Sequence, residues 1–276
     1  MSLVDLVTTA LDGLMPQGGR WLVAVSGGSD SVAALRLLLA ADRDVVAAHV
    51  DHRLRPSSAE DARFVIELCD ALGVQLVSTA VDVAAVAEER GWNLEDAARR
   101  VRYSFLHRAA GETGADGIVV AHTRDDQAET FLRQAARGVA FPAGMPPRRG
   151  MVVRPLLGVG REQLQAYLTG IGQPWREDET NLDVHGQERA WLRHQVVPLL
   201  RSRYPKATTN LARIAASLAD ARDALAALSR QRYGDRSLSA AALAGESPAL
   251  QRAALAGLLE TAGVAPGHDV IEEARV

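Results

Sequence analysis

The chain opens with apolar residues at helical spacing and then changes to short continuous apolar runs. Leu3 to Met15 carries apolar residues every three to four positions, which predicts a helix. Leu22 to Val25 is a short apolar run that predicts a buried strand. Ser26 to Ser31 is a turn of small and polar residues, and the Ala- and Leu-rich run from Val32 to Ala40 predicts a helix. The chain therefore starts as helix, strand, sharp turn and helix.

The same alternation of strands and helices continues to about residue 170. Ser58 is a plausible N-cap for the helix that it begins. Four strands alternating with helices predict the α/β class, as a doubly wound parallel sheet with helices on both faces. The further strands are expected over Asp44–Val50, Val74–Val81 and Gly117–Ala121, and the further helices over Ser58–Leu72, Ala84–Arg90, Asn93 to about Ala110, and Glu162–Gly170.

Beyond the sheet region the pattern becomes helical. Gly138 to Arg149 is rich in Pro, Gly and Arg and predicts an irregular loop. A polar connector from Asp178 to Gly186 suggests a boundary between residues 1–183 and a smaller helical domain over 184–276. An apolar stripe on the longest of its helices is expected to form the core of a bundle. The predicted helices are Ala190–Leu200, Thr208–Gln231 and Ala249–Thr261, and the stripe comprises Leu211, Ile214, Leu218, Ala221, Leu225 and Leu228.

The turn after the first strand has the composition of an anion-binding loop. Its glycines let backbone N–H groups approach a phosphate, and the following helix adds a favourable dipole. Asp30 could hold Mg²⁺ beside the phosphates. The turn contains no Lys, so it is not a G-x-x-x-x-G-K-[ST] loop, and it is not G-x-G-x-x-G. The alternative is an ordinary Gly/Ser turn. The six candidate residues are Ser26, Gly27, Gly28, Ser29, Asp30 and Ser31.

A second polar cluster follows the second strand. His49, Asp51 and His52 lie where open α/β sheets bind ligands, outside the carboxyl ends of the strands. They are candidates for contacts with adenine and phosphate groups. The alternative is a solvated loop with a stabilising Asp–Arg pair.

A third cluster follows the fourth strand and opens a helix. Asp125, Asp126 and Glu129 place three carboxylates within one or two turns. Carboxylates so close together repel unless a cation lies among them, either Mg²⁺ or the ammonium group of a substrate. The alternative is an acidic cap that the helix dipole favours. Because all three clusters follow strands, we expect them to converge on one crevice.

One helix carries Glu95, Arg99 and Arg102 on a single face. Arginine is suited to a bidentate grip on phosphate or carboxylate. An intrahelical Glu–Arg pair on a solvated face is the alternative.

Composition adds a few constraints. Among 276 residues 47% are hydrophobic, as in an ordinary globular protein, and the net charge of −3 gives no global signal for nucleic acid. Residues 185–213 nevertheless carry a local charge of +5, which suggests contact with a nucleic-acid backbone or arginines without a partner. The single cysteine, Cys69, excludes an internal disulfide and an iron–sulfur site. With no long apolar run and no basic leader, a cytoplasmic protein without a membrane span is expected.

These motifs together resemble a known family. The stretch Ser26–Ser31 matches the S-G-G-x-D-S signature of the PP-loop ATP pyrophosphatases. The whole series resembles the tRNA(Ile)-lysidine synthases over about Trp21 to Leu200. The other matching segments are His49–Arg55, Asn93–Glu95 with Ala97–Arg99 and Arg102-Tyr103, Ala121-His122 with Asp125–Thr130, Arg154–Leu157, and Pro174 followed by Asp178 and Thr180-Asn181.

The resemblance implies an activity and its reactants. Members use ATP to adenylate the C2 carbonyl oxygen of the wobble cytidine in an isoleucine tRNA with a CAU anticodon. L-lysine then displaces AMP to give lysidine, which changes codon reading from AUG to AUA. Members form dimers, so a homodimer is also expected. By resemblance, the loop holds pyrophosphate with Asp30 and Mg²⁺, Arg99 and Arg102 stabilise the phosphoryl group, and Asp125, Asp126 and Glu129 bind lysine or take up a proton.

Contacts with the tRNA are expected from the loop near Arg137 and from the basic helical segment. The candidate residues are Arg137, Arg189, Arg193, Arg201, Arg203 and Lys206. The chain departs from the family where Val139-Ala140 replaces a Ser-Gly pair. Many members also have a further C-terminal domain, for which this chain is either too short or incomplete.

Two alternative functions stay open. Another PP-loop tRNA-modifying enzyme, such as a thiolase, would need more cysteines than Cys69. A nucleotide-binding module without catalysis would not need to keep Asp30, Arg99, Asp125 and Glu129 together.

Overall fold

The structure is a computed structural model that describes residues 2–15, 18–54, 58–176, 188–234, 239–264 and 267–275. The chain divides into two compact units, which are described separately. The first comprises Met1–Arg124 and Pro147–Thr180, and the second comprises Asp125–Pro146 and Asn181–Val276. The predicted boundary between residues 183 and 184 lies outside the described residues, as do Asp178 and the Thr180-Asn181 pair.

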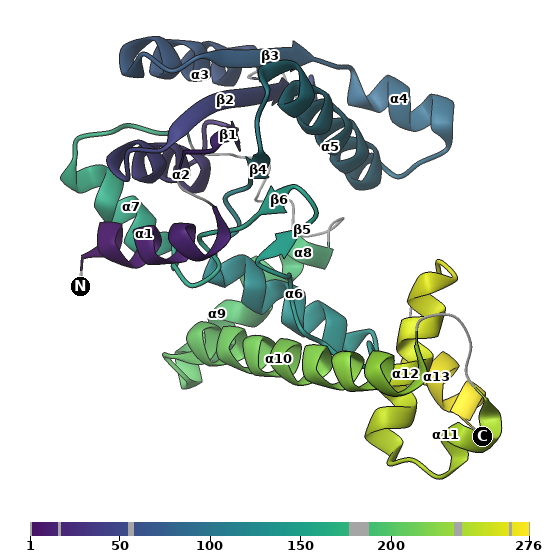
Figure 1. The fold of residues 1–276 in the computed structure, drawn as a ribbon. Helices are drawn as coiled ribbons and strands as arrows, with labels where there is room; N and C mark the ends of the chain where they lie inside the picture. Colours follow the sequence, from purple (N-terminus) through teal and green to yellow (C-terminus); the bar gives the residue numbers. More distant parts are fainter. Residues whose placement is uncertain are drawn as a thin grey trace. The chain divides into compact units, whose positions relative to one another are not determined.

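A sheet of six described strands forms the centre of the first unit (Figure 1). The strand order is β3-β2-β1-β4-β6-β5, and every neighbouring pair is parallel except β5 and β6. The chain moves outward from β1 in both directions, so β1 and β4 flank the point where the order reverses. The strands are β1 (Arg20–Ala24), β2 (Asp44–Asp51), β3 (Leu76–Ala80), β4 (Gly117–Val119), β5 (Arg148–Arg149) and β6 (Val152–Val153).

Alternate residues of the central strands enter two separate cores. Trp21 and Val23 of β1 pack in one core with side chains from α1, α2, α3 and α7, whereas Leu22 packs in the other with side chains from α5. Both faces of the sheet are therefore covered, and the predicted doubly wound α/β fold is confirmed. The helices of this unit are α1 (Leu3–Leu14), α2 (Ser29–Ala40), α3 (Ser58–Leu72), α4 (Val83–Arg90), α5 (Leu94–Thr113) and α7 (Arg161–Gly170).

Two details of the predicted helix starts are wrong. Helix α2 begins at Ser29 rather than Val32, because Gly28 is extended and serves as the N-cap. Ser and Asp are favourable in a first helical turn, so the end of the predicted turn is already helix. Ser58 is the first residue of α3 and not its N-cap. The short hairpin of β5 and β6 was not expected, because two-residue strands carry no periodic signal.

The second unit is helical among its described residues. The helices are α6 (Arg124–Ala136), α8 (Glu188–Trp191), the π-helix η2 (Leu192–Val196), α9 (Val197–Arg203), α10 (Ala207–Tyr233), α11 (Ala240–Ala244), α12 (Pro248–Thr261) and α13 (His268–Arg275). The short helices α11 and α13 and the π-helical turn were not predicted.

The apolar stripe on α10 does not form a bundle core as predicted. Ile214 and Leu228 are 48% and 45% exposed, whereas the small residues Ala215 and Ser229 are buried. Helix α10 packs against α12. The buried face is therefore centred one residue further along the helix than the stripe of large side chains.

Candidate functional site

The loop after β1 has the geometry of an anion-binding turn. Gly27 has a φ of +94°, which strains any residue with a Cβ. Gly28 caps α2 without a side-chain hydrogen bond. The first N–H groups of α2 therefore face the loop, where they can donate hydrogen bonds to a phosphate group.

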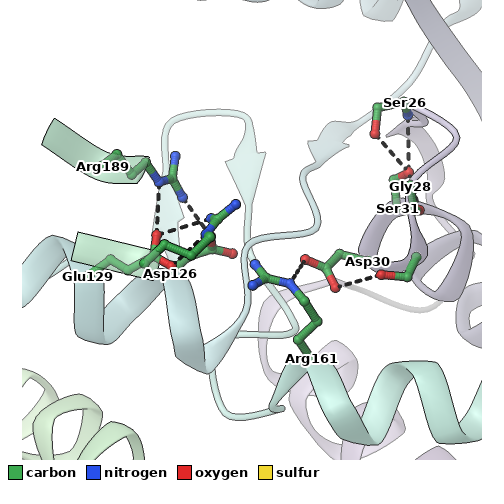
Figure 2. A network of polar contacts seen from close by, with 10 residues as sticks. Ser26, Gly28, Asp30, Ser31, Asp126, Glu129, Arg161 and Arg189 are labelled. Carbon is green, nitrogen blue, oxygen red and sulfur yellow. Dashed lines mark hydrogen bonds and ion pairs between the residues drawn. The ribbon is translucent and has the colours of Figure 1, made fainter. Parts of the chain in front are cut away.

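The hydroxyl of Ser31 holds the loop in shape (Figure 2). It accepts a hydrogen bond from the Ser26 N–H at 3.1 Å and donates one to the Gly28 carbonyl at 3.0 Å. The Ser26 hydroxyl lies 3.2 Å from the same atom. Ser31 is buried, so its hydroxyl acts first as an internal brace of the loop.

Asp30 forms an ion pair that the sequence did not predict. The Nε of Arg161, in the first turn of α7, donates to Asp30 Oδ2 at 3.0 Å, and the Ser29 hydroxyl lies 3.5 Å from Oδ1 (Figure 2). One carboxylate with neighbouring hydroxyls is a donor set through which Mg²⁺ is usually held together with substrate phosphates. These residues therefore fit a magnesium ion, and Asp30 would be its protein ligand.

Arg176 contacts the phosphate-binding loop at Gly27. Its backbone N–H donates to the Gly27 carbonyl at 2.9 Å, and its guanidinium binds Asp61 at 3.1 Å and Glu60 at 2.9 Å. Hydrogen bonds from Arg176 to Asp61 and Glu60 raise the pKa of Arg176. Arg176 thus ties the loop to the first turn of α3, and the sequence contained no local signal for this contact.

His49 and His52 lie at the carboxyl end of β2, the strand next to β1. His49 Nδ1 is 2.7 Å from the carbonyl oxygen of Val25, so Nδ1–H donates to that oxygen, and Nε2 is buried with no hydrogen-bond partner among the described residues. Burial, together with Arg102 and His49, lowers the pKa of His52 to about 4. Asp51 accepts from the N–H of Arg53, whose φ of +51° makes a tight turn.

Arg99 and Arg102 of α5 both pack on Tyr103. Their guanidinium carbons lie 4.9 Å and 5.6 Å from the centroid of its ring. Arg102 also contributes to the low pKa of His52, which places its charge near the end of β2. Stacking on a ring orients an arginine for contact with an anion. Binding of phosphate by either arginine stays a prediction.

The acidic cluster of α6 lies in the second unit and already contacts cations. Asp126 and Glu129 are buried, and Arg189 and Arg193 each bind both carboxylates (Figure 2). The four N–O distances lie between 2.6 and 3.1 Å. Burial opposes the charge of Arg189, but the two carboxylates outweigh it and raise its pKa. The sequence predicted Mg²⁺ or a substrate ammonium group here, and the structure instead places two guanidinium groups of the chain beside these carboxylates, so binding of either expected cation stays a prediction.

Both arginines belong to one helical segment that includes a π-helical turn. Arg189 lies on α8, and Arg193 lies four residues later in η2. Wider turns of this kind redirect side chains within a helix and occur often at functional sites. Asp125 is half-buried on the same helix as the two buried carboxylates.

The predicted clusters are thus distributed over both units. The loop at Ser26–Ser31 and the histidines of β2 belong to the first unit, and Asp125, Asp126 and Glu129 belong to the second. The first two clusters are joined directly at Val25, whose N–H donates to the Ala48 carbonyl and whose carbonyl accepts from His49. Convergence with the acidic cluster stays a prediction.

The candidate tRNA contacts have different surroundings. Arg137 binds Glu188 through Nε and Nη2 of its guanidinium, and Arg189 and Arg193 bind the acidic cluster. Arg201, Arg203 and Lys206 are exposed at the end of α9 and the start of α10. Part of the local charge of +5 is therefore neutralised within the second unit, and contact with tRNA stays a prediction for all six.

Two features are absent from the described residues. None of their helices is long and apolar enough to cross a membrane. Nor do any three of their His, Cys, Asp or Glu side chains come together as a set that could hold a metal ion. The buried thiol of Cys69, on α3, lies in the first core, and burial raises its pKa to about 11.

Comparisons with known proteins agree with this geometry. The chain is 54% identical over 210 residues to the tRNA(Ile)-lysidine synthase of Deinococcus deserti, and the match covers 76% of this chain and 39% of that protein. It is 46% identical over 251 residues to the enzyme of that name from Thermus thermophilus, covering 89% and 49%. The chain thus spans half or less of the length of these curated relatives.

A solved structure shows the same fold. The U34-tRNA thiolase NcsA from Methanococcus maripaludis, which carries a [4Fe-4S] cluster, superimposes with a TM-score of 0.65 at 15% identity. The match covers 78% of this chain and 76% of that one. Residues 6–200 match the model of the PP-loop domain, which is more than half of the sequence, and this chain therefore belongs to the PP-loop domain family.

Proposed function

We propose that this chain carries the catalytic core of a tRNA(Ile)-lysidine synthase. The observation that carries the proposal is the braced S-G-G-x-D-S loop at the start of α2, in a chain 46–54% identical to synthases of that name. The reactants are ATP with Mg²⁺, L-lysine and an isoleucine tRNA with a CAU anticodon. The enzyme class is a ligase that forms a carbon–nitrogen bond.

The reaction has two steps. The O2 oxygen of the wobble cytidine attacks the α-phosphorus of ATP, and the bond to pyrophosphate breaks. An amine of lysine then attacks C2, the C2–O2 bond breaks, and AMP leaves with that oxygen while the amine loses a proton. Both steps need positioning and charge neutralisation more than a strong base.

Within this proposal each described group has a role. The first N–H groups of α2 hold the departing pyrophosphate, and Asp30 is the ligand for Mg²⁺, which supplies further counter-charge when bound. Arg99 and Arg102 neutralise the phosphoryl group that is transferred. Asp125, Asp126 and Glu129 receive the ammonium group of lysine. ATP also contacts His49, Asp51 and His52 through its adenine and phosphate groups.

Lysine must enter a cluster that arginines already occupy. Asp126 and Glu129 carry two negative charges against the two positive charges of Arg189 and Arg193. Asp125 adds a further carboxylate on the same helix. The two arginines ensure that neither buried carboxylate is left as an uncompensated charge before lysine binds.

A thiolase function is disfavoured by Cys69. A thiol with a pKa of about 11, buried in the core, is neither a nucleophile nor a cluster ligand at neutral pH. The cytoplasm is the expected location, because the substrate is tRNA. The homodimer stays a prediction.

The test is incorporation of labelled L-lysine into tRNA transcripts. Wild-type protein should label an isoleucine transcript with a CAU anticodon and release AMP, and it should not label a methionine transcript with the same anticodon. The Asp125→Ala variant should lose labelling. AMP release without lysine uptake would point to another acceptor, and tRNA binding without ATP turnover would indicate a module without catalysis.

A further inference from the structure

The phosphate-binding loop carries no positive charge of its own. Residues Ser26–Ser31 contain one carboxylate, Asp30, and neither Lys nor Arg. A carboxylate and the phosphates of ATP repel each other at short range. A loop of this composition therefore needs a cation from another part of the chain, where other phosphate-binding loops use their own lysine.

Arg161 brings that cation to the loop. It lies 131 positions after Asp30 in the sequence, yet its Nε is 3.0 Å from Asp30 Oδ2. The two side chains are 26% and 21% exposed, so the pair is shielded from solvent and retains an opening to it. Such a pair is screened less than one on the open surface.

The place of Arg161 in α7 is not explained by the helix itself. It is the first residue after the N-cap Gly160, where the helix dipole disfavours a positive charge. Glu162, the next residue, has the sign that the dipole favours. The contact with Asp30 gives a reason for an arginine at this position.

Hydrogen bonds fix the start of α7, so the backbone position of Arg161 is well defined. The N–H of Gly160 donates to Gln163 Oε1 at 3.1 Å, and the N–H of Arg124 donates to the Val159 carbonyl at 2.8 Å. A Cβ on Gly160 would lie 2.3 Å from an arm of Arg124, so the backbone passes directly beneath that side chain. A fixed backbone lowers the entropy that Arg161 loses on binding a ligand.

We propose that Arg161 binds the pyrophosphate part of ATP and acts as the cation of the S-G-G-x-D-S loop. A guanidinium group has five N–H donors in a planar fork, so it can contact a carboxylate and phosphate oxygens together. Arg161 then neutralises Asp30 before the nucleotide binds and the phosphates afterwards. This inference rests on the proposed function, because it assigns a residue to the same nucleotide.

The test is the affinity for ATP, measured by calorimetry on the full chain with excess EDTA and again with Mg²⁺. The variants are Arg161→Gln, which removes the charge, and Arg161→Lys, which keeps it. Arg20→Gln is the matched control, because Arg20 Nε lies at the same distance of 3.0 Å from Asp44 Oδ2 at the opposite end of β1. Thermal unfolding of each variant shows whether it is folded.

Arg161→Gln should weaken binding of ATP in EDTA by about tenfold or more, the usual effect of losing a hydrogen bond to a charged group. Added Mg²⁺ should restore a large part of the loss, because it supplies counter-charge that the variant lacks. The ATP affinity of Arg161→Lys should lie between those of wild type and Arg161→Gln, and Arg20→Gln should bind ATP as tightly as wild type.

Three results would overturn the inference. In the first, Arg161→Gln binds ATP as tightly as Arg20→Gln does. In the second, Arg161→Gln loses the same factor in ATP affinity with and without Mg²⁺, as loss of a purely structural residue would cause. In the third, Arg161→Lys has the same ATP affinity as Arg161→Gln. Labelling of tRNA with lysine by wild type, together with any of these, would contradict only the role of Arg161. If wild type binds ATP as described but labels no tRNA, the proposed function fails while the role of Arg161 stands.

Discussion

At the scale of single residues, the end of β2 shows how a buried histidine can shape a neighbouring loop. His49 donates to the carbonyl of Val25, the residue before the phosphate-binding loop. It is 5% exposed, so water cannot replace this donor. The direction of the chain entering the loop therefore depends on a side chain from the adjacent strand.

Two substitutions of His49 should distinguish the effect of its hydrogen bond to Val25 from the effect of its packing. In His49→Leu the buried Val25 carbonyl loses its donor, which costs about 1–3 kcal/mol in the free energy of unfolding. His49→Asn keeps a donor at nearly the same position and should retain more of the affinity for ATP, although it loses volume. Urea unfolding and ATP titration check this, and equal ATP affinities for the two variants would refute a role in positioning the loop.

His52 should make stability depend on pH. Its pKa is about 4 in the folded protein and 6.5 in the unfolded chain, so the unfolded state binds more protons between these values. Stability contributed by neutral His52 is thus complete above pH 6.5 and is lost as the pH falls towards 4. Urea unfolding at pH 7 and pH 5 should show that the free energy of unfolding falls less between these pH values for His52→Gln than for wild type. His107→Gln, at an exposed histidine on α5, should behave like wild type.

At the scale of elements, the contact between β1 and β4 depends on a residue without a side chain. A Cβ on Gly117 would lie 2.3 Å from the ring of Trp21, which is buried in the core. This close approach lets the large ring lie across the neighbouring strand at the amino end of the sheet. The glycine is needed for space rather than for its backbone conformation.

Gly117→Ala should therefore destabilise the first unit. Overpacking a rigid core costs about 1–3 kcal/mol, and the Trp21 ring cannot move without disturbing its neighbours. Gly111→Ala is the control, because that glycine lies in α5 with open space around it and should gain up to about 1 kcal/mol from helix propensity. Chemical unfolding of both variants measures the difference. Similar stability for the two would show that the Trp21 ring has room to move.

The helices of the second unit show a related dependence on small residues. The predicted core of α10 assumed that its largest apolar side chains face inward. Ala215 and Ser229 are buried whereas Ile214 and Leu228 are exposed, so the buried face is not the one with the largest apolar side chains. Periodicity alone does not distinguish two adjacent stripes on one helix, because both repeat with the same spacing.

At the scale of the whole molecule, a net charge of −3 contrasts with the tRNA substrate that we propose. Arg189 and Arg193 are engaged by Asp126 and Glu129, and Arg137 by Glu188. Nonspecific attraction to the phosphate backbone should then come mainly from exposed charges elsewhere. Arg203 and Lys206 are such charges, and Arg201 is exposed near them in the chain.

Removing these three charges should change the salt dependence of tRNA binding. The Arg201→Gln, Arg203→Gln, Lys206→Gln triple variant should reduce the slope of log affinity against log salt by about 0.7–0.9 for each phosphate that the variant no longer neutralises. A triple variant of Arg20, Arg90 and Arg108 removes the same charge from exposed sites of the first unit. Filter binding at several salt concentrations measures both, and equal slopes would exclude tRNA binding at the end of α9.

The sequence by itself determined the features that depend on neighbouring residues. The alternation of strands and helices and the S-G-G-x-D-S loop both follow from local spacing and chemistry, and the α/β fold was predicted from the alternation. The tertiary structure alone decided which charges meet. Arg161 with Asp30, Arg176 with Asp61, and Arg189 with Glu129 join residues 60 to 131 positions apart. Such pairs have no periodic signal, because they depend on where the packed elements place their ends.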